Sequence, residues 1–164
     1  MSAPKRIQQR RTKGWRKPEG AVAVGRQTKW GNPYTVGGKP NGLACVPGAV
    51  TGLDWEWEDR ISAAGMRHDF FHEGGRVTAC TIRDLTREEA VLLYREALTR
   101  QHEHFRDPRW AYIGRRGEAL TVDDVRRELA GRDLMCFCPL DQACHADVLL
   151  EIANAPDEPP AGAS

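Results

Sequence analysis

The stretch DLMCFCPLDQACHADVLLEIAN, residues 133–154, predicts a strand, a short turn and a helix. Its first part, residues 133–138, runs apolar up to Pro139, which is typical of an interior strand in a parallel sheet that is covered on both faces. Its last part, residues 145–154, places its apolar side chains on one face of a helix. A strand that leads through a turn into a helix indicates an α/β protein.

Three further elements fit the same class. The T-R-E-E sequence at residues 86–89 is a capping box, and the apolar stripe behind it predicts a helix over residues 87–105. A second start signal, residues 121–124, predicts a shorter helix that Gly131 ends. The A-V-A-V run at residues 21–24 predicts another buried strand. We therefore predict a small three-layer α/β sandwich with a mostly parallel sheet.

The chain has 164 residues, which suits one domain with a real core. We expect a single α/β domain over residues 21–154, preceded by a basic flexible arm over residues 1–20 and followed by a disordered, proline-rich tail over residues 155–164. Glycine and proline interrupt any periodicity in residues 38–80, so this middle is expected to be rich in loops.

The arm carries seven basic residues and one acidic residue, within a chain whose net charge is +1. Such a segment attracts polyanions because phosphate contacts release counterions, so nucleotide or nucleic acid is the expected partner. A merely solvated arm is the alternative. No apolar run is long enough for a membrane helix, and the five cysteines do not resemble a secreted disulfide framework. We expect a cytoplasmic protein without a membrane partner, and the sequence leaves its oligomeric state open.

The polar loop that follows residues 21–24 is the first candidate for a binding site. In α/β sheets, ligands bind in the crevice at the carboxyl ends of strands, where such loops meet. Basic side chains and a hydroxyl suit phosphate, an indole offers a stacking face, and an amide can read a base edge. The candidate ligand-binding residues are Arg26, Thr28, Lys29, Trp30 and Asn32. A tight turn with Trp30 in the core is the alternative.

The turn before residues 145–154 is the second candidate. Cys144 is expected to be the N-cap of the helix, with His145 and Asp147 in its first turn. A helix N-terminus favours negative charge, so it is expected to lower the thiol pKa of Cys144 and to attract an anion. We predict Cys144, His145 and Asp147 as catalytic residues and Cys138 as a further ligand-binding residue.

A metal site is the competing interpretation of this turn. Cys136, Cys138, Cys144 and His145 have the ligand types of a tetrahedral zinc site. Their spacing is less typical, because two adjacent side chains on a helix diverge by about 100°. We therefore expect no metal and no cofactor. Inert buried thiols beside a capping cysteine are the third alternative.

Three stretches also resemble a known family. They are RTKGWRKPEGAVAVGRQTKWGNPY (residues 11–34), TREEAVLLYREAL (86–98) and LAGRDLMCFCPLDQACHADVLLEIAN (129–154). They resemble a domain-of-unknown-function family of bacteriophages and actinobacteria, whose members share a K-W-G-N-P loop and a C-x-C-P…C-H-A-D segment. The resemblance implies no activity, but it supports pairing the two motifs across one crevice.

These observations predict a nucleotide-directed or nucleic-acid-directed protein with an anion-binding crevice between the K-W-G-N-P loop and the Cys-His helix start. A hydrolase or a glycosyl-bond enzyme is the reaction class that such a crevice favours. The alternative is a noncatalytic, zinc-stabilised module that binds nucleic acid. The sequence leaves open whether the protein is an enzyme.

Overall fold

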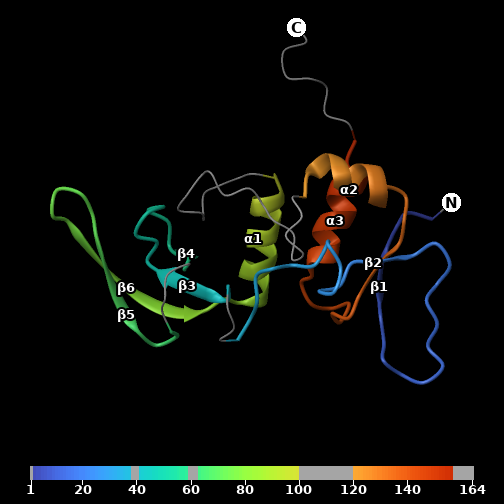
Figure 1. Ribbon diagram of the computed structural model, residues 1–164, viewed down its shortest axis with the longest axis horizontal. Helices are drawn as coiled ribbons and strands as arrows, with labels where there is room; N and C mark the ends of the chain where they lie inside the picture. The colour runs from blue at the N-terminus through green and yellow to red at the C-terminus, as the bar shows by residue number, and fades with distance from the viewer. Residues whose placement is uncertain (1, 38–40, 59–62, 100–119, 157–164) are drawn as a thin grey trace, which may run out of the picture.

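The computed structural model describes residues 2–37, 41–58, 63–99 and 120–156, and Figure 1 shows how its elements are arranged. Two sheets and three helices make up this part of the chain. Sheet A has the strand order β1 (Arg6–Gln8), β7 (Leu134–Cys136), β2 (Val22–Ala23). Sheet B has the order β4 (Glu56–Trp57), β3 (Leu43–Val46), β6 (Val77–Asp84), β5 (Arg67–Phe71). The helices are α1 (Arg87–Thr99), α2 (Val122–Leu129) and α3 (His145–Asn154).

Sheet A is parallel, and β7 is its central strand. Leu134 is paired with Arg6 of β1 on one side and with Val22 of β2 on the other. All three residues of β7 are buried, as the apolar run in the sequence predicted. The strand is shorter than the predicted residues 133–138, and it ends at Cys136.

Sheet B is antiparallel and comes from the middle of the chain, which the sequence predicted as rich in loops. A mixed α/β composition is confirmed, but the three-layer sandwich with a mostly parallel sheet was wrong. The hairpin between β5 and β6 shows why. Gly74 and Gly75 have φ values of 85° and 88°, a left-handed conformation that favours glycine. The glycines that interrupted the periodicity therefore turn one strand back on the next.

Each helix begins where the sequence predicted. In the capping box before α1, Glu89 N donates to Thr86 Oγ1 at 3.2 Å and Thr86 N donates to Glu89 Oε2 at 2.9 Å. Thr121 and Asp124 form the same reciprocal pair at the start of α2. Cys144 is the N-cap of α3. The predicted end of the first helix at residue 105 lies outside the described residues.

The main core lies around α1 and α3. In Figure 1, α1 stands between the two sheets, while α2 and α3 lie beside sheet A. Fully buried side chains from these helices and from β7 meet there, among them Leu93, Tyr94, Val125, Leu134 and Leu149. This packing fixes the end of β7 against the start of α3.

The beginning of the chain is part of this core structure. Residues 1–20 were expected to be a flexible arm, whereas residues 6–8 form β1 and pair with β7. Strand pairing uses backbone groups, and residues 6–8 contain only one apolar side chain, Ile7. Hydrophobic periodicity therefore gave no indication of a strand here. Most of the predicted tail, residues 157–164, lies outside the described residues.

The described helices contain no segment long and apolar enough to cross a membrane.

Candidate functional site

A pocket of about 410 Å³ opens where β2 and β7 end, beside the start of α3. The loop after β2 and the loop after β7 form two of its walls, and the first residues of α1 form a third. Its lining includes Arg11, Gly25, Arg26, Gln27, Asn32, Tyr34, Val36, Arg87, Ala90, Val91, Cys136, Phe137, Cys138, Ala143, Cys144 and His145. The K-W-G-N-P region and the Cys-His helix start thus face one crevice, at the carboxyl ends of parallel strands.

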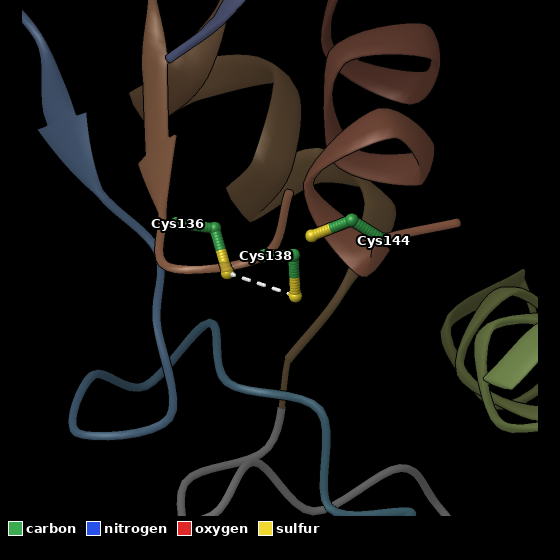
Figure 2. A group of neighbouring side chains, drawn as sticks. All are labelled: Cys136, Cys138 and Cys144. Atoms are coloured by element: carbon green, nitrogen blue, oxygen red, sulfur yellow. Dashed lines mark hydrogen bonds between the residues drawn. The ribbon is translucent and has the colours of Figure 1, made fainter. Parts of the chain in front are cut away.

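Three thiols meet at this pocket. Cys136 ends β7, Cys138 lies in the loop that follows, and Cys144 precedes α3, and Figure 2 shows their side chains turned toward one another. The three Sγ atoms all lie within 4.8 Å of one another. The Sγ atoms of Cys136 and Cys138 are 3.7 Å apart, and all five cysteines of the chain are free.

The thiols differ in acidity. Hydrogen bonds from Cys136 and Cys144, together with the charge of Arg87, lower the pKa of Cys138. Hydrogen bonds to Cys136 and Cys138, together with burial, raise the pKa of Cys144. The prediction of a depressed pKa at Cys144 was therefore wrong. The amide of Ala146 does donate to Cys144 Sγ at 3.4 Å, but its neighbours outweigh the effect of the helix start.

His145 is buried, with 5% of its surface exposed. Its Nε2 lies 2.6 Å from the carbonyl oxygen of Val24, which can only accept, so Nε2 carries the proton. Nδ1 then presents its lone pair to Cys144 Sγ at 3.7 Å. Burial lowers the pKa of His145, so the ring is neutral and ties β2 to α3.

Asp147 does not belong to the pocket lining. Its Oδ1 lies 2.9 Å from Nε of Arg6, and its side chain is 52% exposed. The same guanidinium donates to the carbonyl oxygens of Pro139, Leu140 and Gln142 at 2.9–3.1 Å. Asp147 thus helps to hold the arginine that fastens the loop between Cys138 and Cys144, which is a structural contact.

The candidate residues of the K-W-G-N-P loop separate into two groups. Arg26 and Asn32 line the pocket. The described pocket lining does not include Thr28, whose hydroxyl donates to Gly25 O at 2.8 Å, or Lys29, whose Nζ pairs with Glu128 at 2.6 Å. Trp30 is only 4% exposed and packs in the main core.

Asn32 also makes hydrogen bonds that hold the loop in place. Its Nδ2 donates to the carbonyl oxygen of Ala90 at 3.0 Å, and its Oδ1 accepts from the amide of Tyr34 at 2.9 Å. The side chain is buried, so it joins the loop to α1 rather than presenting a free amide to a ligand.

Two arginines of the pocket were not predicted as site residues. Arg87 Nη1 lies 3.5 Å from Cys138 Sγ, and the Arg11 guanidinium stands 4.7 Å from the centre of the Phe137 ring. Arg87 lies within the T-R-E-E capping box, which was interpreted only as a helix start. Arg11 was counted with the arm, where the excess of basic charge was the available signal.

The chain belongs to the family described as Domain of unknown function (DUF4326), whose model matches residues 7–155. No curated protein and no solved structure matches the chain.

Proposed function

We propose that this member of the DUF4326 family binds the phosphate group of a nucleotide in the pocket between the K-W-G-N-P loop and the start of α3. The observation that supports the proposal most strongly is the charge of the pocket. Arg11, Arg26 and Arg87 line it, and none of its described lining residues is acidic. Arginine donors match phosphate oxygens in geometry and charge.

The size and the remaining walls of the pocket suit the rest of a nucleotide. About 410 Å³ lies within the range of small-ligand sites. Phe137 and Tyr34 contribute aromatic surface to its lining, and Gln27 contributes an amide. Any of the nucleobases can stack on such aromatic surfaces, whereas an amide can form hydrogen bonds with the edge of a particular base.

The proposal concerns binding rather than turnover. Asp147 is paired with Arg6, and the Nε2 proton of His145 is engaged by Val24 O. Asp147 is then not available as a general acid or base toward the pocket, and His145 retains only the Nδ1 lone pair, which faces Cys144 Sγ at 3.7 Å. A hydrolase or glycosyl-bond activity would need a further residue, and Cys138, which is half-buried whereas Cys144 is buried, is the more accessible thiol.

Calorimetric titration tests the proposal. Each of the four ribonucleoside 5′-monophosphates is compared with its nucleoside, using wild type and Arg26→Ala. Because a charge-assisted hydrogen bond contributes roughly 1.5–3 kcal/mol, Arg26→Ala is expected to weaken monophosphate binding at least about tenfold. Nucleoside binding should stay unchanged.

Arg67→Ala is the matched control, since Arg67 is an exposed arginine on β5 of sheet B. It should leave both affinities at the wild-type value. Equal affinity of wild type for nucleosides and monophosphates, or equal weakening by Arg26→Ala and Arg67→Ala, would contradict a phosphate site in the pocket.

The loop between β1 and β2 extends the proposal to nucleic acid. Its side chains Arg10, Lys13, Arg16 and Lys17 are exposed, and Arg11 of the same loop lines the pocket. A nucleic-acid strand whose terminal nucleotide occupies the pocket would run along these basic side chains. Phosphate contacts of this kind position a strand without reading its sequence.

Neutralising Lys13, Arg16 and Lys17 together is expected to weaken binding of single-stranded DNA at low salt. Because three side chains then no longer neutralise phosphates, the slope of log K against log salt should fall in magnitude by about 2. Fluorescence anisotropy over a salt series measures the slope. Lys13→Arg with Lys17→Arg preserves the charge and should retain it. An unchanged slope in the triple variant would rule out this role of the loop.

A further inference from the structure

We propose that Cys136, Cys138 and Cys144 together bind one zinc ion, with the fourth coordination position open to the pocket. The argument for this site does not use the nucleotide proposal, although both sites face the same pocket, and it reverses the expectation of no metal that the spacing favoured. The argument rests on the separation of the three sulfurs, on the structure that holds them and on the donors around them (Figure 2).

The separations suit a single ion. A zinc–sulfur bond of about 2.3 Å places the sulfurs of a tetrahedral site about 3.8 Å apart. Sγ of Cys136 and Sγ of Cys138 are 3.7 Å apart, and Sγ of Cys144 completes a set whose members all lie within 4.8 Å of one another. Small side-chain rotations bring all three to bonding distance of one centre.

The backbone that carries the thiols is held in place from several sides. Cys136 lies on β7, which is paired on both edges. Cys144 is the N-cap of α3. Arg6 fastens the loop between them through the carbonyl oxygens of three of its residues. The strand pairing and the Arg6 contacts use backbone groups, and the N-cap bond from Ala146 N also positions the Cys144 thiol, so the three ligands are arranged before an ion binds.

The donors around the cluster suit sulfur that carries negative charge. The amide of Ala146 donates to Cys144 Sγ at 3.4 Å, and Arg87 Nη1 lies 3.5 Å from Cys138 Sγ. Such N–H groups commonly surround metal-bound thiolates. Three thiolates and one divalent ion leave a single negative charge, which the neighbouring Arg87 balances.

The fourth position is open because His145 is not part of the set. The mutually close ligand atoms are those of the three cysteines alone among the described residues; Nδ1 of His145 lies 3.7 Å from Cys144 Sγ but does not belong to the set. All three cysteines line the pocket, so a water molecule or an anionic ligand from the pocket completes the coordination.

Metal analysis of the full-length protein tests the site. Protein purified under reducing conditions without chelator, and apoprotein reloaded with Zn²⁺, should each contain about one equivalent of zinc. Cys138→Ser should lower the content at least about tenfold, and this half-buried position leaves the core intact, which circular dichroism checks. Cys45→Ser and Cys80→Ser change buried cysteines of sheet B and should retain the full equivalent.

One spectroscopic measurement and one further variant test which side chains are the ligands. The Co²⁺ form should show thiolate-to-metal charge transfer with the intensity of three sulfurs, and His145→Gln, which retains a donor toward Val24 O, should keep the ion. Failure of the wild type to take up zinc or cobalt would overturn the proposal. So would equal zinc loss in Cys45→Ser and Cys138→Ser, or iron with acid-labile sulfide in place of a single ion. The assay contains no nucleotide, so these outcomes do not bear on the proposed phosphate site.

Discussion

Trp30→Ala is expected to lower the free energy of unfolding by about 3–5 kcal/mol, the range typical of truncating a buried aromatic side chain. The indole is 4% exposed and belongs to the main core. The main-chain carbonyl oxygen of Trp30 accepts a hydrogen bond of 2.8 Å from the Tyr94 hydroxyl, which anchors the loop to α1. Loss of the ring leaves a cavity beside this anchor. Urea denaturation followed by circular dichroism measures the change.

Lys29→Ala is the neighbouring control. Its ion pair with Glu128 is about one-third exposed on both sides, so solvent screens it and the expected loss is below about 1 kcal/mol. Trp30→Phe should fall between the two. If Trp30→Ala unfolded at the wild-type urea concentration and instead weakened nucleotide binding, the indole would be a ligand contact and its assignment to the core would be wrong.

Arg6→Ala is expected to lower the free energy of unfolding by about 3 kcal/mol. The side chain is 7% exposed and makes four polar contacts, three to carbonyl oxygens and one to Asp147. Hydrogen bonds to a charged group contribute roughly 1.5–3 kcal/mol each, and water that replaces the guanidinium at the exposed carbonyls recovers part of the sum. Thermal and urea unfolding measure the net loss.

Arg10→Ala removes an exposed arginine a few residues later and should change the stability by less than about 0.5 kcal/mol. Arg6→Lys keeps the charge but not the planar fork, so it should recover only part of the loss. An Arg6→Ala protein as stable as Arg10→Ala would show that the loop before Cys144 holds its shape without the guanidinium.

The helices could be predicted because their signals are local. The side chains of Thr86, Glu89, Thr121 and Asp124 act within one turn of the backbone that they cap, so the sequence contains the whole interaction. Strand β1 depends instead on a partner that lies 128 residues away, as Arg6 pairs with Leu134 (134 − 6 = 128). Neither its length nor its composition marks that pairing.

The same distinction applies to the site. The carboxyl ends of parallel strands share one edge of a sheet, so the sequence was enough to bring Arg26 and Asn32 together with Cys138, Cys144 and His145. The sequence does not determine how side chains are oriented within a turn. The prediction therefore missed that Lys29 pairs with Glu128 and that Trp30 is buried in the core. The position of Asp147 outside the pocket lining could not be predicted either, because its partner Arg6 lies 141 residues away in the sequence (147 − 6 = 141).

Sheet A imposes an order on how the protein can be assembled during synthesis. Its two outer strands, residues 6–8 and 22–23, are synthesised more than 100 residues before the strand between them, residues 134–136 (134 − 23 = 111). Sheet B can pair sooner, since its strands lie within residues 43–84. The nascent chain therefore carries residues 6–8 and 22–23 without their partner strand until residues 134–136 have been made. The pocket and its three thiols form only once residues 136–145 have left the ribosome.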